Sequence, residues 1–180
     1  MISLIGLVTE LLSALTLIGD VLLIFLIYRL VIKKDFKNNF LTKNTLFFAF
    51  IISLIATFGS LFYSEIAGYI PCKLCWYQRI FMYPLPLLLG IALFKKDNKI
   101  SRYAIPLSII GGIISIYHYI TQILNNSAIC SAESTTCASK IFFSYGYITI
   151  PIMALTVFAL IIFLTYINNK NNYNCKEVNE

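Results

Sequence analysis

The chain has 180 residues, of which 59% are hydrophobic and 12% are charged. Soluble domains carry about 25% charged residues, so this composition excludes an ordinary soluble domain and a disordered chain. The formal net charge is +6. It does not predict a nucleic-acid partner, because the basic residues lie between apolar runs instead of forming one patch. The composition therefore predicts an all-α integral membrane protein.

Five apolar segments follow one another along the chain. They are residues 11–32, 45–63, 76–94, 103–124 and 147–167. Each is long enough to cross a hydrocarbon layer of about 30 Å at a rise of about 1.5 Å per residue. Because a backbone in lipid must satisfy its hydrogen bonds within its own segment, we expect five transmembrane helices. Pro84 and Pro86 are expected to kink the third one.

The basic residues predict the orientation of these helices. Most of the 14 Lys and Arg residues lie around the first and third connections or in the C-terminal tail. The exceptions are Lys73, Arg79 and Lys140. Since cytoplasmic loops carry the excess of Lys and Arg, the sequence predicts an outside N-terminus and a cytoplasmic C-terminus. The connections at residues 64–75 and 125–146 then face outward.

The first 32 residues do not resemble a secretory signal peptide, because no basic residue precedes Arg29 and an acidic residue, Glu10, interrupts the stretch. We expect residues 1–10 to lie at the outer interface. Asp20 then falls near the middle of the membrane, where a carboxylate is a candidate functional residue. The alternative is a protonated or partner-paired aspartate that packs this helix onto the others.

Four of the five cysteines form two pairs. Cys72 and Cys75 form a Cys-x-x-Cys motif at the outer end of the third helix. Cys130 and Cys137 bracket a polar insert of six residues in the second outer loop. Both pairs lie on the predicted oxidising side, where disulfides form and persist. Cys175 lies alone in the tail and is expected to be a free, unreactive thiol.

The surroundings of the first pair favour a redox-active site. Cys75 falls in the first turn of its helix, where free backbone N–H groups and the helix dipole stabilise a thiolate. Arg79 follows on the same helical face, where it stabilises that thiolate and offers donors to an acceptor oxygen. Four cysteines are also a ligand set for structural zinc. Because a zinc site has no use for Arg79, we expect no metal.

A stripe of small and polar residues follows one face of the fourth segment and includes the only histidine of the chain. Its members are Ser108, Gly111, Ser115, His118 and Gln122. This stripe is either a helix-packing face with one satisfied histidine or a donor and proton relay beside a bound carbonyl compound. A second stripe, in the second segment, is interpreted as packing. It contains Ser53, Thr57, Ser60 and Ser64.

Several motifs resemble the DsbB/BdbC family of disulfide bond formation proteins, most closely its BdbC branch. The most specific motif is residues 71–84, Pro-Cys-Lys-Leu-Cys-Trp-Tyr-Gln-Arg-Ile-Phe-Met-Tyr-Pro. The others are Tyr-Ser-Glu-Ile at 63–66, Ser-Ile-Tyr-His-Tyr at 115–119, the loop with the second cysteine pair, and Gly-Tyr-Ile-Thr-Ile-Pro at 146–151. The resemblance covers the chain from about residue 43 to residue 167.

The resemblance implies a four-helix transmembrane bundle at residues 43–168, preceded by one additional N-terminal transmembrane helix and linker at 1–42 and followed by a cytoplasmic tail at 169–180. It implies a thiol:quinone oxidoreductase of the bacterial cell membrane. Such an enzyme reoxidises an extracytoplasmic thioredoxin-like thiol oxidase of the DsbA/BdbD type and passes the electrons to a membrane quinone, ubiquinone or menaquinone.

By the same resemblance, Cys72 and Cys75 are the quinone-proximal pair, and Arg79 and His118 lie beside the quinone. These roles follow from matching positions in the motifs, and they favour the functional interpretation of His118 over the packing one.

The resemblance also implies that Cys130 and Cys137 form the disulfide that meets the partner protein. The first helix is additional to the family's pattern, so it inherits no role. Two other functions stay open: a non-catalytic membrane scaffold with two structural disulfides, and a transmembrane thiol reductase. The reductase would need cysteines reachable from the cytoplasm, and both pairs are predicted to lie outside.

Overall fold

The computed structural model describes residues 2–32, 44–95, 97–124 and 148–177. Every regular element in these ranges is a helix, which confirms the predicted all-α fold. Five helical stretches are long and apolar enough to cross a membrane. The chain is therefore a multi-pass membrane protein with the number of crossings that the sequence predicts.

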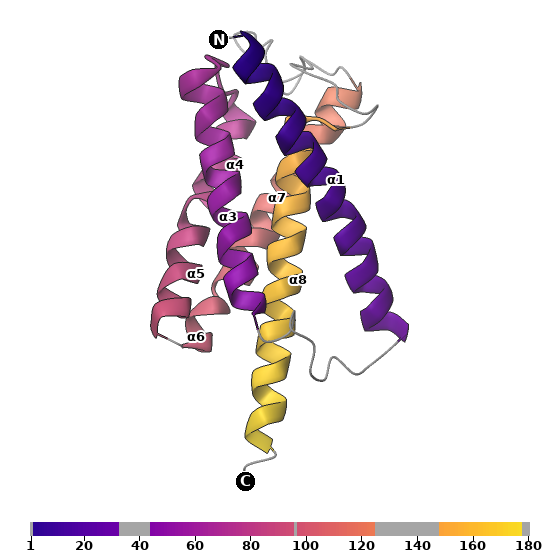
Figure 1. Cartoon of the computed structure of the whole chain (residues 1–180), viewed down its shortest axis with the longest axis vertical. Helices are drawn as coiled ribbons and strands as arrows, with labels where there is room; N and C mark the ends of the chain where they lie inside the picture. The colour runs from indigo at the N-terminus through magenta and orange to yellow at the C-terminus, as the bar shows by residue number, and fades with distance from the viewer. Residues whose placement is uncertain (1, 33–43, 96, 125–147, 178–180) are drawn as a thin grey trace.

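The helices run alternately up and down one long axis (Figure 1). In chain order they are α1 (Ile2–Ile32), α3 (Thr45–Leu61), the π-helix η1 (Phe62–Ile66), α4 (Lys73–Met82), α5 (Pro84–Lys95), α6 (Asn98–Ser101), α7 (Ala104–Leu124) and α8 (Ile150–Glu177). The π-helix η1 continues α3, and α4 and α5 together make one crossing. The N- and C-termini lie at opposite ends, as five crossings require.

Two boundaries refine the sequence prediction. Helix α1 begins at Ile2 and its apolar stretch at Leu4, because the apolar run continues on the N-terminal side of Glu10. The third crossing is interrupted at Tyr83, between α4 and α5, which is where the sequence predicts the kink. Pro84 takes the first position of α5, and because it has no N–H, the hydrogen-bond ladder of α4 does not continue through it.

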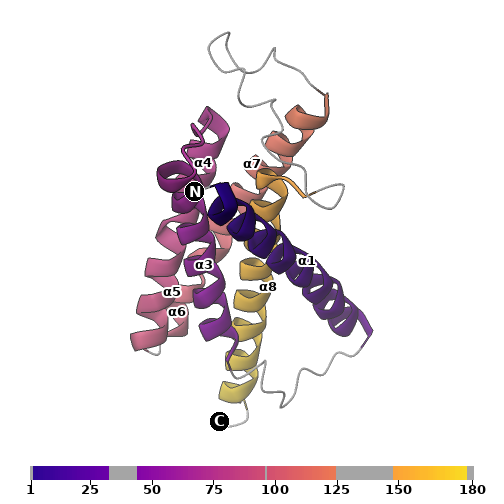
Figure 2. The same cartoon turned by 45° about the horizontal axis from the view of Figure 1, so that its top comes forward.

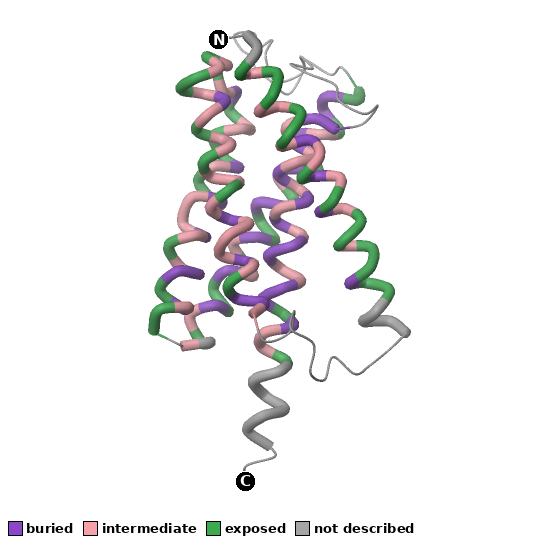
Figure 3. Tube along the Cα trace, viewed as in Figure 1, coloured by how far each residue is buried: buried purple, intermediate pink, exposed green. Residues whose placement is uncertain are grey.

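Helix α8 lies at the centre of the bundle and packs against α7, α3 and α1. Half of its membrane-spanning stretch is buried, against 22% for α1. Figure 3 shows the contrast: buried positions recur along the part of α8 that lies within the bundle, whereas α1 is largely exposed. Helix α1 buries one face, at Ser13, Thr16, Gly19 and Leu26, and exposes most of its other apolar side chains, which suits a helix between a bundle and lipid. Helix α1 therefore covers the bundle from one side only.

The close packing of α7 on α8 depends on Gly111. A Cβ atom at this position would lie 2.4 Å from Cζ of Phe158, whose side chain is fully buried. At Gly112 a Cβ atom would meet the nearest atom of Phe158 at 3.8 Å, which is ordinary contact. For Gly111, the packing interpretation of the polar stripe is therefore confirmed.

The substitution Gly111→Ala is expected to lower the free energy of unfolding in detergent by about 1–3 kcal/mol, because the new methyl group overpacks the Phe158 ring. Gly112→Ala is the matched control and should be neutral or stabilising by up to about 1 kcal/mol, since alanine favours the helix. Equilibrium unfolding of the two purified variants measures the difference. Equal stability of both variants would contradict this account of the α7–α8 contact.

Candidate active site

The Cys-x-x-Cys motif lies at the N-terminal end of α4. Cys72 is the N-cap residue, with φ −71° and ψ 168°, and its sulfur accepts a hydrogen bond from the backbone N–H of Cys75 at 3.4 Å. Cys75 lies in the first turn, as predicted. The N-terminal end of a helix favours negative charge. In this structure the backbone N–H of Cys75 donates to the sulfur of Cys72, although the sequence predicts that the helix end stabilises a thiolate at Cys75. The reason is that Cys72 holds the capping position.

The two sulfur atoms are placed for reversible pairing. They lie 3.1 Å apart in the reduced state, with Cys72 buried and Cys75 partly exposed. A disulfide requires about 2.05 Å between the sulfurs, so a small movement of the two side chains closes the bond. The start of α4 thus holds the two cysteines in a position from which the dithiol can convert to a disulfide and back with little movement.

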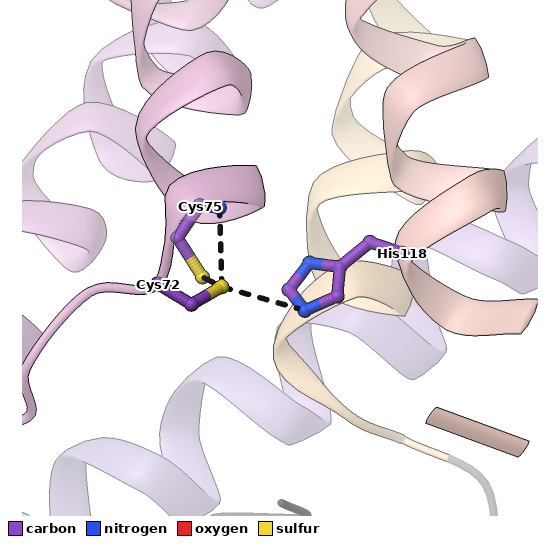
Figure 4. A group of neighbouring side chains, drawn as sticks. All are labelled: Cys72, Cys75 and His118. Carbon is purple, nitrogen blue, oxygen red and sulfur yellow. Dashed lines mark hydrogen bonds between the residues drawn. The ribbon is translucent and has the colours of Figure 1, made fainter. Parts of the chain in front are cut away.

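His118 reaches this pair from α7. Its Nε2 atom lies 3.7 Å from Sγ of Cys72, and its side chain is only 2% exposed. Figure 4 shows the imidazole pointing across the gap between the helices toward the two sulfurs. The other ring nitrogen, Nδ1, is buried and has no hydrogen-bond partner among the described residues. The structure therefore places the only histidine of the chain beside Cys72.

Arg79 lies one turn along α4 and is anchored to α3. Its Nε atom donates to Oγ of Ser60 at 3.0 Å, and Nη2 donates to the backbone oxygen of Ser60 at 3.1 Å. The guanidinium also lies 5.6 Å from the ring centroid of Trp76. Ser60 therefore has a role beyond the predicted packing, because it lies on the α3 face toward α4 and supplies the two acceptors that orient Arg79.

Gln78 is a further site residue that the sequence analysis did not identify. It is buried, and its Nε2 donates to Oγ of Ser115 at 3.1 Å, which in turn donates to the backbone oxygen of Gly111. This chain of hydrogen bonds joins α4 to α7. The only sequence signal for it is that Gln78 lies next to Arg79 within an otherwise apolar crossing.

A cavity of about 360 Å³ opens in front of the dithiol. Its walls come from α1, α3, α4, α7 and α8. Its polar lining includes Cys72, Cys75, Gln78, Arg79, His118 and Gln122, and also Thr16, Ser60, Tyr63, Tyr69, Thr149 and Thr156. Most of the remaining lining is apolar. Small-molecule sites typically measure about 300–1,000 Å³ and combine an apolar lining with a few polar groups, and this cavity has both properties.

The polar end of the cavity fits a ligand with polar atoms on a flat head group. Nδ1 of His118 and Oε1 of Gln122 are buried without a hydrogen-bond partner in the described part of the chain. Arg79 adds a guanidinium, which has five N–H donors and uses two of them on Ser60. A quinone, with two acceptor oxygens and an apolar tail, would complement the N–H donors of Arg79, and the hydroxyl of its reduced form would complement Oε1 of Gln122.

The same groups also resemble a metal-ligand set. The ligand atoms of Cys72, Cys75 and His118 all lie within 4.8 Å of one another. Tetrahedral zinc with Zn–S bonds of about 2.3 Å places two sulfurs about 3.8 Å apart, and the sulfurs here are closer, at 3.1 Å. The sulfur–sulfur distance is shorter than a zinc site needs and suits a dithiol that closes to a disulfide; the expectation that no metal is bound stays a prediction.

The second cysteine pair, Cys130 and Cys137, lies outside the described residues, and so does Lys140. The backbone at Cys175 belongs to α8, but its side chain is also outside the described part. The expected roles of these residues stay predictions.

A polytopic helical bundle with a Cys-x-x-Cys dithiol in a membrane-level cavity belongs to the class of membrane disulfide oxidoreductases. Residues 42–168 match the family described as "Disulfide bond formation protein DsbB". This match covers well over half of the chain, and the protein belongs to that family. It begins after α1, the helix that the sequence analysis treats as additional.

Curated relatives agree with this assignment. Disulfide bond formation protein C of Bacillus subtilis (strain 168) is 48% identical over 119 residues, covering 65% of this chain and 86% of the relative. The SPbeta prophage-derived disulfide bond formation protein B of the same organism is 47% identical, covering 69% and 84%. A probable disulfide formation protein of Chlamydia caviae is 38% identical, covering 68% and 90%. No solved structure matches the chain.

Proposed function

We propose that this protein is a thiol:quinone oxidoreductase. It reoxidises an extracytoplasmic thioredoxin-like thiol oxidase of the DsbA/BdbD type and passes the electrons to ubiquinone or menaquinone in the bacterial cell membrane. The observation that carries the proposal is the position of the Cys72–Cys75 dithiol at the polar end of an apolar cavity. A lipid-soluble acceptor reaches a cavity of that kind from the membrane, whereas a structural disulfide has no need of one.

The thiol chemistry balances in two exchanges. A thiolate of the reduced partner attacks a Cys130–Cys137 disulfide, passes through a mixed disulfide and leaves as the oxidised partner, so that Cys130 and Cys137 become thiols. These thiols reduce a Cys72–Cys75 disulfide in the same way. The Cys72–Cys75 pair becomes a disulfide again when it releases two electrons and two protons. A bound quinone supplies the two-electron acceptor for that last step.

The described residues divide the work at the polar end of the cavity. His118, with Nε2 at 3.7 Å from the Cys72 sulfur, accepts a thiol proton as the disulfide forms and passes it on toward the acceptor, which takes up two protons with the two electrons. Arg79 holds the acceptor oxygen and stabilises the negative charge that develops there. Gln78 is bonded to α7 and fixes the distance between the helix that carries the sulfurs and the helix that carries His118.

The proposed orientation places this end of the bundle outside the cytoplasm. The start of α4 lies at the same end of the molecule as the N-terminus, and α6 lies at the end of the C-terminal tail (Figure 1). Basic residues are concentrated at the α6 end, where Lys95, Lys99 and Arg102 lie. Since cytoplasmic loops carry the excess of Lys and Arg, the partner protein meets the opposite end.

Thiol labelling tests the proposed function directly. The Cys175→Ser protein, reduced in detergent and freed of reductant, is alkylated before and after mixing with a soluble ubiquinone analogue. We expect the quinone to lower alkylation of Cys72 and Cys75 by at least about tenfold, because both thiols become a disulfide. Alkylation that is independent of quinone would support the scaffold with structural disulfides and contradict the oxidase.

A further inference from the structure

The segment that leads from α3 into the Cys-x-x-Cys motif has a defined shape. The π-helix η1 (Phe62–Ile66) continues α3, and short π-helices occur frequently at functional sites. Just beyond it, the backbone N–H of Tyr69 donates to the backbone oxygen of Tyr63 at 3.0 Å. Gly68 lies inside this turn with φ 70°, a conformation that glycine adopts without strain. The chain is thus folded back on η1 before it reaches Cys72.

This turn brings two tyrosine rings together. The rings of Tyr63 and Tyr69 are stacked, with centroids 6.0 Å apart and an interplanar angle of 25°. Tyr63 is only 7% exposed, and the lining of the cavity continues from the two tyrosines to Cys72. Because one ring is buried and the two backbones are hydrogen-bonded, the stack fixes the short segment that ends at the N-cap of α4.

Helix α1 contacts the buried tyrosine of this stack. The side chains of Thr9 and Tyr63 form a hydrogen bond. The hydroxyl of Thr9 donates to the backbone oxygen of Ile5 at 2.8 Å, so its oxygen accepts from the phenol. Further along α1, the Leu12 side chain lies 3.3 Å from the position that a Cβ atom would take on Gly59. In Figure 2 α1 crosses the bundle obliquely, with its N-terminal end near the end of α3 that continues into η1.

A second set of contacts holds the middle of α1 against α8. Gly19 allows a close approach, since a Cβ atom there would lie 3.1 Å from Cγ2 of Thr156 and 3.2 Å from Cδ1 of Leu160. The hydroxyl of Thr156 donates to Oδ1 of Asp20 at 2.7 Å, which favours the partner-paired interpretation of Asp20. Helix α1 lies outside the family match, which begins at residue 42, yet these contacts fix it to the bundle, and from there it holds Tyr63.

We infer that Tyr63 is a positioning residue for the dithiol and that α1 acts on the dithiol through it. Thr9 and Tyr69 hold the Tyr63 side chain in place. The segment after the stack then keeps Cys72 at the N-cap of α4, where its sulfur accepts the N–H of Cys75. That hydrogen bond stabilises a Cys72 thiolate, and a pair whose reduced form is stabilised is a stronger oxidant. The inference rests on the proposed function, in which this pair oxidises the loop thiols before it is itself reoxidised.

The equilibrium of the pair with glutathione is the first test. The full chain in detergent is equilibrated with reduced and oxidised glutathione at a series of ratios, the thiols are alkylated, and the oxidised fraction of Cys72 and Cys75 is measured by peptide mass spectrometry. For Tyr63→Leu we expect the equilibrium constant to shift toward the disulfide by about tenfold, equivalent to about 30 mV for a two-electron couple.

Phe58→Leu is the matched control for Tyr63→Leu, because Phe58 lies on α3 and is 66% exposed, and its equilibrium constant should match that of the wild type. Equal constants for the two variants would overturn the inference, since a tyrosine that only stabilises the fold changes the melting temperature and leaves this constant as it is. Gly68→Ala is a second variant that keeps both rings. A Cβ atom there meets nothing within 4 Å, so only the turn is strained, and we expect a shift in the same direction of about threefold. An unchanged constant in Gly68→Ala would also overturn the inference.

A double-mutant cycle tests the action of α1. Thr9→Val and Tyr63→Phe each remove one partner of the hydrogen bond and leave the ring stack in place. We expect each to shift the equilibrium toward the disulfide by about two- to threefold, and the double variant to shift it no further, because the same bond is lost only once. Additive shifts, or a shift in Tyr63→Phe alone, would overturn the action of α1 on the dithiol.

The wild-type protein separates failure of this inference from failure of the proposed function. If its Cys72–Cys75 dithiol becomes a disulfide with quinone while the Tyr63 and Gly68 variants keep the wild-type equilibrium constant, only the positioning role is refuted. If the wild-type pair stays reduced with quinone, the proposed function is refuted, and the inference with it.

Discussion

The substitution Cys75→Ser is expected to abolish quinone reduction, with a loss of at least about 1,000-fold, whether the electrons come from the partner protein or from a small dithiol such as dithiothreitol. Serine cannot form the disulfide that must appear when two electrons leave the pair. Cys130→Ser should have a different result: partner-dependent turnover is lost, whereas turnover with the small dithiol is kept, because that reductant reaches Cys72 and Cys75 directly. Quinone absorbance during steady-state turnover measures both activities.

Cys175→Ser is the control for these two variants and should keep both activities, since it removes the one cysteine outside the two pairs. Retention of dithiol-dependent turnover in Cys75→Ser would show that the electrons do not leave through the motif. Retention of partner-dependent turnover in Cys130→Ser would reduce the loop pair to a structural role and leave the partner to react with Cys72 and Cys75 themselves.

The crossings of this protein could be predicted from the sequence because each is a long apolar run, and a lipid environment permits such a run only as a helix. The break before Pro84 was predictable for the same local reason, the missing N–H. Helix α1 begins at Ile2, before the predicted apolar segment at residues 11–32, because the apolar residues on the N-terminal side of Glu10 continue the helix; the placement of residues 1–10 at the outer interface stays a prediction. The local sequence thus determines where the helices form, but a single charged residue does not mark where a helix begins.

The packing of the site was not predictable to the same degree. Arg79 was identified from its spacing to Cys75, but its acceptor Ser60 lies on another helix, and no pattern along the chain specifies which helix faces which. The same holds for the bond between Gln78 and Ser115. The capping role of Cys72 was partly predictable. A side chain that accepts from the backbone N–H three residues later marks a helix start, and the Cys-x-x-Cys motif has this spacing.

Arg79 has two possible roles, binding of the quinone oxygen and connection of α4 to α3, and a single substitution of Arg79 affects both. Arg79 lines the cavity and also joins α4 to α3 through Ser60. If the guanidinium binds the quinone oxygen, Arg79→Ala should raise the quinone KM by tenfold or more, equivalent to about 1.4 kcal/mol. If it only joins the two helices, the same variant should lose thermal stability while its KM stays unchanged.

Ser60→Ala resolves the ambiguity, because it removes the hydroxyl acceptor of Nε and leaves the backbone acceptor and the charge of Arg79 in place. We expect a smaller rise in quinone KM, about two- to threefold, with kcat nearly unchanged, since a less firmly oriented guanidinium still reaches the oxygen. Arg79→Lys should fall between Ser60→Ala and Arg79→Ala, because lysine keeps the charge but lacks the planar fork that holds two acceptors at once. A KM that is the same in all three variants would remove Arg79 from the quinone site and leave Ser60 and Arg79 as a structural link between α3 and α4.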